Sequence, residues 1–327
     1  MPKTFNSVNF GCRVNAAETN QLSQQLVDHG YVFDDQNPDT VIINTCAITK
    51  KGEYESLSKI ETIQKKYPHA KILVTGCADF SKIKNLKNVE IIPKNKISTS
   101  YTPQIKDKFS HTNRYLLKVQ SGCTVNCTFC IVPSRRPTLD FLPIDDAVKI
   151  INSSENYQEV IITGVNLTQY TPGLSNLVEA LLTRTSIKLI SFGSVPLLCV
   201  DDKFIKLLEN PRVSHFLHIP LQSGSNKVLK LMHRPYDVKK IKETFTKLKS
   251  ISGLTFGTDI IVGFPTETES DFQNTYGLCQ QIGFFKIHVF KYSPRPGTQA
   301  RELFLKSEKI SKTILSERSK KLRNLVL

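Results

Sequence analysis

The sequence has no apolar run long enough to cross a membrane. A transmembrane helix needs about 18 or more consecutive apolar residues, and no segment of the 327 residues approaches that length. The first ten residues, MPKTFNSVNF, also lack the apolar region of a signal peptide. Internal repeats and long low-complexity segments are absent. These absences predict a globular protein without a membrane partner, and the length suits two domains.

Acidic residues are scarce relative to basic ones. The chain has 29 Asp and Glu against 44 Lys and Arg, which leaves a net charge of +15. An excess of this size favours a polyanionic partner, because Lys and Arg bind phosphates and release counterions. A generally basic proteome or a solvated basic surface explains the charge equally well. Composition alone therefore does not select a nucleic acid as the partner.

A CxxxCxxC run lacks the fourth ligand that a structural zinc site needs. It contains Cys123, Cys127 and Cys130, and the next cysteine downstream is Cys199. Three thiolates on one loop can hold three irons of a [4Fe–4S] cluster and leave the fourth iron open to a small molecule. Structural zinc requires four protein ligands. The ligand count favours a cluster over a zinc knuckle or three unrelated buried thiols.

Three apolar runs further upstream each end in a cysteine. They are residues 5–12 (FNSVNFGC), 40–46 (TVIINTC) and 71–77 (KILVTGC). The segments between them, residues 15–30 and 52–67, repeat apolar residues at helical spacing. This alternation of strands and helices predicts parallel strands joined by crossovers.

Cys12, Cys46 and Cys77 should therefore converge. All strands of a parallel sheet finish at one edge, which is where open α/β sheets bind ligands. Any one of these cysteines alone would be read as a small buried apolar residue. Their repetition at three strand ends, again without a fourth ligand, predicts a second cluster with an open iron.

Cysteine use indicates a reducing compartment. Six of the eight cysteines belong to these two groups, which argues for the cytoplasm rather than for a disulfide framework. Cys199 and Cys279 are left over, and we interpret them as buried or incidental.

The loop around Cys123, Cys127 and Cys130 resembles the cluster loop of the radical S-adenosylmethionine enzymes. With the upstream cysteines, nearly the whole chain is similar to the methylthiotransferase family of that superfamily. The matching motifs are GCRVN (11–15), INTC (43–46), TGC (75–77), TGVN (163–166), HIPLQSGS (218–225), TDIIVGFP (258–265) and HVFKYSPRPGT (288–298).

The resemblance implies an α/β protein with two domains. Residues 1–105 would form a Rossmann-like parallel α/β domain, residues 106–113 a linker, and residues 114–327 a partial (β/α)6 barrel. Strand candidates in the second domain are YLLKVQ, EVIITG, IKLISFG, HFLHIPL, LTFGTDIIVG and KIHVFKY. Basic residues between Lys306 and Arg323 alternate with apolar ones, which predicts an amphipathic helix with its apolar stripe on the barrel and its basic side in water.

The resemblance also implies two cofactors and their binding residues. Cys123, Cys127 and Cys130 would bind the [4Fe–4S] cluster that cleaves S-adenosylmethionine. Cys12, Cys46 and Cys77 would bind an auxiliary [4Fe–4S] cluster that carries the sulfur to be transferred. The residues expected to contact S-adenosylmethionine are Phe129, Gly164, Gln222, Ser223, Asp259 and Gly263.

Two histidines lie near these positions. His218 and His288 are interpreted as hydrogen-bonded structural residues rather than as iron ligands.

Within the family, the motifs HIPLQSGS and HVFKYSPRPGT look most like the branch that acts on N6-threonylcarbamoyladenosine in tRNA. That branch inserts a methylthio group at C2 of the adenine next to the anticodon. The alternatives are the isopentenyladenosine branch and the branch that modifies a ribosomal protein side chain. The implied partners are tRNA and a flavodoxin or ferredoxin as electron donor, and a monomer is expected.

Two departures from the family pattern motivate a further alternative. The arginine- and glycine-rich stretch usual after the third cysteine appears here as IVPSRRPTLD (131–140), and the usual Arg-x-Ser-Ser-x-Glu-Pro appears as SFGSVPL (191–197). The sequence also ends before the small β-barrel RNA-binding domain that family members usually carry. A divergent iron–sulfur protein without turnover is therefore a competing hypothesis, although all six cysteines are retained.

Overall fold

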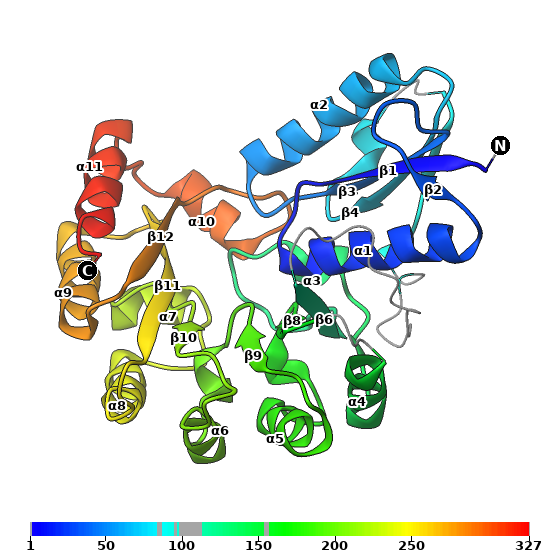
Figure 1. Cartoon of the computed structure of the whole chain (residues 1–327). Helices are drawn as coiled ribbons and strands as arrows, with labels where there is room; N and C mark the ends of the chain where they lie inside the picture. The colour runs from blue at the N-terminus through cyan, green and yellow to red at the C-terminus, as the bar shows by residue number, and fades with distance from the viewer. Residues whose placement is uncertain (1, 84–86, 95–96, 98–112, 154–156, 327) are drawn as a thin grey trace. The chain divides into compact units, whose positions relative to one another are not determined.

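The structure, a computed structural model, describes residues 2–83, 87–94, 97, 113–153 and 157–326 (Figure 1). The chain divides into two compact units. The first unit comprises Met1–Thr124 and Val132–Ile190, and the second comprises Val125–Ile131 and Ser191–Leu327. Of the expected linker, only Asn113 lies within the described residues.

The first unit begins with a parallel five-stranded sheet of order β2-β1-β3-β4-β5. Its elements are β1 (Thr4–Asn9), α1 (Arg13–Asp28), β2 (Val32–Phe33), β3 (Thr40–Thr45), α2 (Lys50–Lys66), β4 (Lys71–Gly76) and β5 (Val89–Ile91). The three predicted strands and both predicted helices are present, and their parallel order is confirmed. The short strands β2 and β5 were not predicted.

The alternation of side chains along β3 builds an apolar core on each face of this sheet. Val41 and Ile43 belong to a buried cluster that includes Ile60 of α2, whereas Ile42 packs with Leu22 of α1. Successive strand residues point to opposite faces, so a fully apolar strand has to be covered on both sides. Helices α1 and α2 provide the two covers (Figure 1).

The first unit continues with a second sheet of order β7-β6-β8-β9. The elements of this segment are β6 (Arg114–Ser121), α3 (Val132–Arg135), β7 (Asp140–Phe141), α4 (Ile144–Asn152), β8 (Glu159–Gly164), α5 (Leu174–Arg184) and β9 (Leu189–Phe192), which ends just past the unit boundary. Strands β6 and β8 are parallel, while β7 is antiparallel to β6.

The second unit contains a parallel sheet of order β10-β11-β12. Its elements are α6 (Asp202–Leu207), β10 (Phe216–His218), α7 (Asn226–Leu231), α8 (Val238–Leu248), β11 (Thr255–Val262), α9 (Glu269–Ile282), β12 (Lys286–Lys291), α10 (Gln299–Lys306) and α11 (Lys312–Arg323). Single 3-10 turns occur at Phe80–Lys82, Leu167–Gln169 and Leu197–Cys199. All six strand candidates from Arg114 onward form strands.

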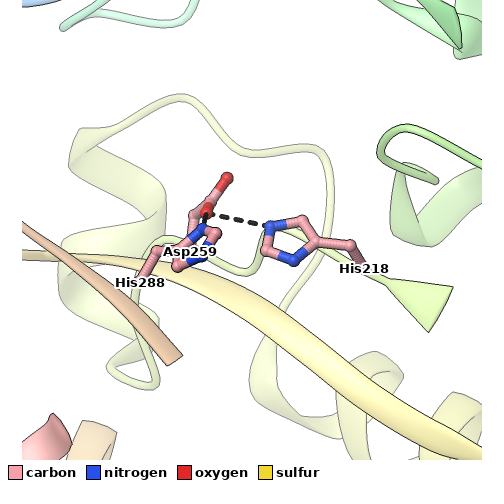
Figure 2. A group of neighbouring side chains, drawn as sticks. All are labelled: His218, Asp259 and His288. Carbon is pink, nitrogen blue, oxygen red and sulfur yellow. Dashed lines mark hydrogen bonds and ion pairs between the residues drawn. The ribbon is translucent and has the colours of Figure 1, made fainter. Parts of the chain in front are cut away.

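The three strands of this second unit bring His218, Asp259 and His288 together (Figure 2). Asp259 on β11 is directly paired with His288 on β12. His218 on β10 is paired with Gly257, and a Cβ atom on Gly257 would lie 2.8 Å from Nδ1 of His218. The absence of a side chain at Gly257 therefore leaves room for the His218 ring beside β11.

The prediction of one amphipathic helix at the carboxyl-terminal end is wrong in two respects. The segment forms two helices, α10 and α11, because the chain leaves helical geometry at Ser307 and restarts with Ser311 as the amino-terminal cap of α11. The predicted apolar stripe is partly exposed at Leu305. Arg318, expected in water, is buried because the buried carboxylate of Glu267 accepts its hydrogen bond at 2.8 Å.

None of the helices in the described part of the chain is both long and apolar enough to span a membrane.

Gly76, which ends β4 just before Cys77, allows a test of this architecture. Its φ is +123°, and a Cβ atom there would lie 2.2 Å from Oγ1 and 2.3 Å from the backbone nitrogen of Thr45. We expect Gly76→Ala to lower the free energy of unfolding by about 3 kcal/mol in urea titrations.

Gly30 is the matched control for that substitution. It also has a positive φ of 83°, but nothing lies within 4 Å of its ideal Cβ position. Gly30→Ala should therefore show only the backbone strain, about 1 kcal/mol. Equal losses in the two variants would mean that the approach of β3 to Gly76 is unimportant.

Candidate functional site

Cys12, Cys46 and Cys77 lie at the carboxyl ends of three adjacent strands of the first sheet. Cys46 and Cys77 directly follow β3 and β4, whose last residues are paired in register. Cys12 follows β1 by three residues. The backbone nitrogen of Cys77 donates to the carbonyl of Thr45 at 3.1 Å. The sheet edge predicted from the sequence therefore carries all three cysteines.

Two of these thiols lie at the amino-terminal ends of helices. Cys12 is the cap residue of α1, and the Sγ atom of Cys46 lies 3.8 Å from the ideal Cβ position of Gly52 in the first turn of α2. Helix amino termini favour anions, including thiolates. Burial, and to a smaller extent the neighbouring thiols of Cys77 and Cys12, raise the pKa of the Cys46 thiol.

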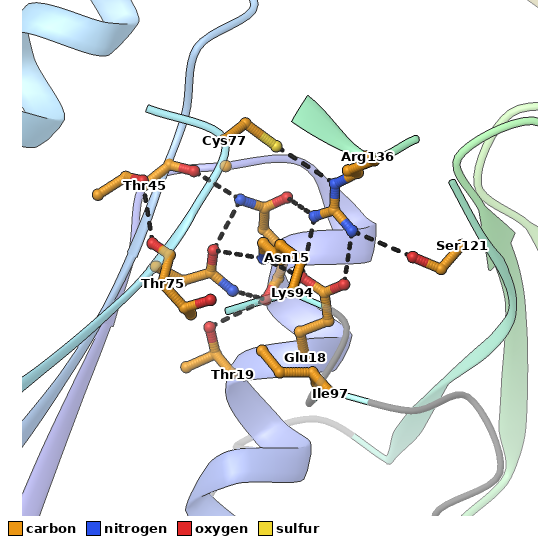
Figure 3. Close-up of polar contacts among 12 residues, drawn as sticks. Asn15, Glu18, Thr19, Thr45, Thr75, Cys77, Lys94, Ile97, Ser121 and Arg136 are labelled. Carbon is orange, nitrogen blue, oxygen red and sulfur yellow. Dashed lines mark hydrogen bonds and ion pairs between the residues drawn. The ribbon is translucent and has the colours of Figure 1, made fainter. Parts of the chain in front are cut away.

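The third thiol, Cys77, accepts a hydrogen bond from a buried arginine (Figure 3). Nε of Arg136 lies 3.3 Å from Sγ of Cys77. The two terminal nitrogens of the same guanidinium contact the two carboxylate oxygens of Glu18 at 2.6 and 2.9 Å. This bidentate geometry is the strong form of an arginine–carboxylate pair.

Glu18 stays ionised although it is completely buried. Burial raises the pKa of its carboxyl group, but Arg136 and the ammonium groups of Lys94 and Lys118 hold that pKa well below its usual range. Burial by itself would lower the pKa of Arg136, and the charges of Glu18 and Cys77 raise it above the usual value. The site therefore holds fixed charges of both signs next to the thiols.

Sequence reasoning missed Arg136 and Glu18. The signal for Glu18 was its position on the apolar stripe of α1, one and two turns before Leu22 and Leu26. A charged residue on such a stripe requires a buried partner. No comparable local signal existed for Arg136, because its partner Glu18 is 118 residues away.

The cysteines of the CxxxCxxC run are divided between the two compact units. Cys123 belongs to the first unit, where its Sγ accepts a hydrogen bond from Nδ2 of Asn166 at 3.6 Å. Cys127 and Cys130 belong to the second. There, Sγ of Cys127 accepts from Arg234 at 3.6 Å, and the Arg234 guanidinium also contacts the hydroxyl of Tyr236. An arginine, here partly buried, thus contacts a thiol of this set too.

The residues expected to contact S-adenosylmethionine lie in both units. In the first, Gly164 ends β8, and a Cβ atom on it would lie 2.7 Å from Leu167. In the second, Phe129 packs against a cluster that includes Ile261 and Phe264. Their binding role stays a prediction.

Three further predicted residues have defined local environments in the second unit. Gln222 adopts a left-handed φ of 72° and forms a bridge to Ile260 of β11. The hydroxyl of Ser223 shares a hydrogen bond with Thr275 at 3.2 Å. Gly263, at the end of β11, donates its backbone N–H to Glu267 at 2.6 Å. These contacts fix the backbone around the end of β11.

Asp259 is the shared acceptor of two imidazoles. Its Oδ1 atom lies 2.9 Å from Nε2 of His218 and 3.2 Å from Nδ1 of His288 (Figure 2). The three donor atoms lie within 4.8 Å of one another, and two imidazoles with one carboxylate are a donor set that transition metals accept. Both histidines are hydrogen-bonded, as expected from the sequence.

The residues around Cys12, Cys46 and Cys77 fit an iron–sulfur cluster. Thiolates are the protein ligands of such clusters, and strand ends and helix amino termini hold these three in place. Glu18 is in contact with three cations, Lys94, Lys118 and Arg136. Asp140 adds a more distant negative charge near Lys118. The remaining positive charge matches a site that holds anionic sulfur.

Comparisons with known proteins match two successive parts of the chain to two family profiles. The profile of the Radical SAM superfamily matches residues 117–279, and the profile described as "Uncharacterized protein family UPF0004" matches residues 4–94. The radical S-adenosylmethionine methyltransferase TsrM from Kitasatospora setae, solved with cobalamin and a [4Fe–4S] cluster, has a similar fold. Its TM-score is 0.65 at 12% identity, over 92% of this chain and 77% of that one.

Two curated relatives show how close the resemblance is. The threonylcarbamoyladenosine tRNA methylthiotransferase MtaB of Thermotoga maritima is 33% identical over 92% of this chain and 77% of its own length. The tRNA-2-methylthio-N(6)-dimethylallyladenosine synthase of Thermodesulfovibrio yellowstonii is 31% identical over 90% of this chain and 77% of its own length.

The fold and the CxxxCxxC loop define a radical S-adenosylmethionine enzyme, so a [4Fe–4S] cluster and S-adenosylmethionine are its cofactors. Identity over most of the chain narrows the class further. The chain belongs to the methylthiotransferase family and is a transferase. The predicted α/β fold class, a Rossmann-like parallel domain followed by a radical S-adenosylmethionine barrel domain, is confirmed.

The Glu18 carboxylate makes stability depend on pH in a defined direction. Glu18→Gln should lower the free energy of unfolding by about 3 kcal/mol at pH 7, because it removes the counter-charge of buried cations. Glu18 has a lowered pKa in the folded state, so its contribution is present above the unfolded value of 4.5 and is lost as the pH falls through the folded value. Urea unfolding at pH 7, 5 and 4 measures the difference in free energy of unfolding between wild type and Glu18→Gln. This difference should shrink below pH 4.5.

Glu55→Gln is the matched control for this measurement. Glu55 pairs with Lys51 at 3.6 Å, and both side chains are largely exposed, so its removal should change stability by less than about 0.5 kcal/mol. A Glu18→Gln effect that grew toward acid pH would contradict the assignment of an ionised, buried carboxylate.

Proposed function

We propose that this protein inserts a methylthio group at C2 of N6-threonylcarbamoyladenosine next to the anticodon of tRNA. The observation that carries the proposal is the presence of two separate three-cysteine sets, each with an arginine in contact with a thiol. A second cysteine set distinguishes methylthio transfer from simple cleavage of S-adenosylmethionine. The named function of the Thermotoga maritima relative supports the same substrate.

Each group of residues has its own part in the proposal. Cys123, Cys127 and Cys130 would hold the cluster whose electron cleaves S-adenosylmethionine. Cys12, Cys46 and Cys77 would hold the auxiliary cluster that carries the sulfur. The residues that would hold the adenosine and amino acid parts of S-adenosylmethionine are Phe129, Gly164, Gln222, Ser223, Asp259 and Gly263.

The domain division proposed from the sequence follows these roles. Residues 1–105 would carry the auxiliary site, residues 106–113 would be a linker, and residues 114–327 would carry the radical chemistry. The two profile matches support this division, since one ends at residue 94 and the other begins at residue 117. The enzyme would act in the cytoplasm as a monomer, with a flavodoxin or ferredoxin as its electron donor.

Anaerobic reconstitution tests the two-cluster assignment. The wild-type protein should bind about eight irons. With dithionite, S-adenosylmethionine and threonylcarbamoyladenosine-containing tRNA, it should form 5′-deoxyadenosine and a methylthiolated nucleoside. The triple substitution Cys12→Ala, Cys46→Ala and Cys77→Ala should reduce iron to about four, keep 5′-deoxyadenosine formation and abolish methylthiolation.

The two remaining cysteines provide the control. Cys199→Ala with Cys279→Ala removes thiols outside both sets, so the iron content should stay at about eight. Unchanged iron in the Cys12, Cys46 and Cys77 variant would overturn the auxiliary site. No 5′-deoxyadenosine from the wild-type protein under strong reductant would favour the inactive iron–sulfur protein instead.

The substrate branch is tested by nucleoside analysis of cells that lack the gene. We expect threonylcarbamoyladenosine to lose its methylthio group while isopentenyladenosine keeps it, measured by mass spectrometry of digested tRNA. Loss of the methylthio group from isopentenyladenosine alone would select the branch to which the Thermodesulfovibrio yellowstonii relative belongs. Loss from neither nucleoside would point to a protein side chain as the substrate.

A further inference from the structure

Every N–H donor of the Arg136 guanidinium has an acceptor. Arginine has five such donors in a rigid plane, and Arg136 is only 3% exposed. Besides Glu18 and Cys77, its terminal nitrogens contact Oδ1 of Asn15 at 3.1 Å and Oγ of Ser121 at 3.3 Å. The bonds to four different residues leave the plane of the guanidinium a single orientation, and that orientation directs Nε at the Cys77 sulfur (Figure 3).

Asn15 extends these contacts to the other two strand ends. Nδ2 of Asn15 donates to Oδ1 of Asn44 and to the carbonyl of Thr45, both at 2.8 Å. In return, Nδ2 of Asn44 donates to the backbone carbonyl of Asn15 at 2.8 Å. Thr45 immediately precedes Cys46. On its own element, Asn15 is one turn after Cys12, whose Sγ lies 3.6 Å from Oδ1 of Asn15. One arginine thus connects, directly or through Asn15, to the surroundings of all three cysteines.

The charges around this arginine are arranged in two layers. Glu18 lies on the side of the guanidinium away from Cys77 and is also paired with Lys94 and with Lys118 at 3.6 Å. On the other side, Nε of Arg136 contacts the thiol. The Glu18 carboxylate therefore pairs with all three cations. The Nε–H group of Arg136 contacts the Cys77 sulfur and not a carboxylate. A buried cation in this position stabilises negative charge on the sulfur.

We propose that Arg136 is a positioning residue that orients the Cys12, Cys46 and Cys77 set and raises the reduction potential of the cluster bound there. This inference rests on the proposed function, which assigns an iron–sulfur cluster to these cysteines. The potentials of such clusters depend on net charge and on hydrogen bonds to sulfur. An N–H bond to sulfur and a nearby positive charge both favour the reduced cluster, which is the more negative form.

Glu18 has the opposite effect in this arrangement. Its negative charge disfavours the reduced cluster, while its bidentate bonds hold Arg136 in place. Substitutions of the two residues should therefore shift the potential in opposite directions. A purely structural role predicts shifts of the same sign, because either substitution would loosen the same contacts.

The test isolates the auxiliary site. Full-length protein with Cys123→Ala, Cys127→Ala and Cys130→Ala retains only the Cys12, Cys46 and Cys77 set and is reconstituted anaerobically. Iron and sulfide are counted, and the midpoint potential is measured by redox titration with electron paramagnetic resonance. In this background Arg136→Met should lower the ratio of reduced to oxidised cluster at a fixed potential about tenfold, which corresponds to about 59 mV for a one-electron couple.

Three further variants control the measurement. Arg135→Met removes a neighbouring positive charge that pairs with Asp79 at 3.6 Å, and it should change the ratio less than twofold. Arg136→Lys keeps the positive charge but removes the planar group with several donors. Its effect on the ratio of reduced to oxidised cluster should therefore be intermediate. Glu18→Gln should raise the ratio of reduced to oxidised cluster and thus has the opposite sign to Arg136→Met.

The outcomes separate this inference from the proposed function. About four irons in the background protein, with opposite shifts for Arg136→Met and Glu18→Gln, support the inference. About four irons with an unchanged potential in Arg136→Met overturn it and leave the proposed function standing. The absence of iron from the background protein, while wild type binds about four, overturns both. If Arg136→Met does not fold, the signs for Arg136→Lys and Glu18→Gln decide in the same way.

Discussion

The buried ion pair between Arg136 and Glu18 is the interaction on which the arrangement of the first unit depends. It connects α1 to the segment that follows the CxxxCxxC loop. Arg136 also contacts the thiol of Cys77, and Glu18 also pairs with Lys94 and Lys118. Buried ion pairs are weak evidence for stability, because apolar residues of similar volume often replace them without loss. Its placement beside Cys77 is therefore better explained by the cluster proposed to bind there than by folding alone.

An arginine next to a thiol occurs in both units. Arg136 contacts Cys77 in the first, and Arg234 contacts Cys127 in the second. Both guanidinium groups also have a second partner that fixes their plane, Glu18 in one case and Tyr236 in the other. Lysine could supply the charge but not a planar group with several directed donors. Each proposed cluster would then be held by thiolates and oriented by one arginine guanidinium.

Much of this could be predicted from the sequence, because the relevant signals were local. The strand ends at Cys12, Cys46 and Cys77 followed from apolar runs and crossover helices. Arg136 could not be assigned, since its partners in α1 are more than 100 residues away and no periodicity links them. The prediction for Arg318 was wrong for the same reason. Helical periodicity placed Arg318 on the water side of α11, but its guanidinium pairs with the buried carboxylate of Glu267. Local patterns specify elements, whereas buried charge pairs depend on tertiary structure.

These pairs also change what the net charge of +15 means. Arg136, Lys118 and Arg318 are buried and engaged with carboxylates, so they cannot contact a phosphate. The cations available to a polyanion are exposed ones, such as Lys239 and Lys242 on α8. Part of the positive excess is therefore placed beside a thiol of the proposed cluster site and is not available to an RNA backbone. The same composition supports both roles because sulfur clusters and phosphates are anions that arginine and lysine recognise by the same electrostatics.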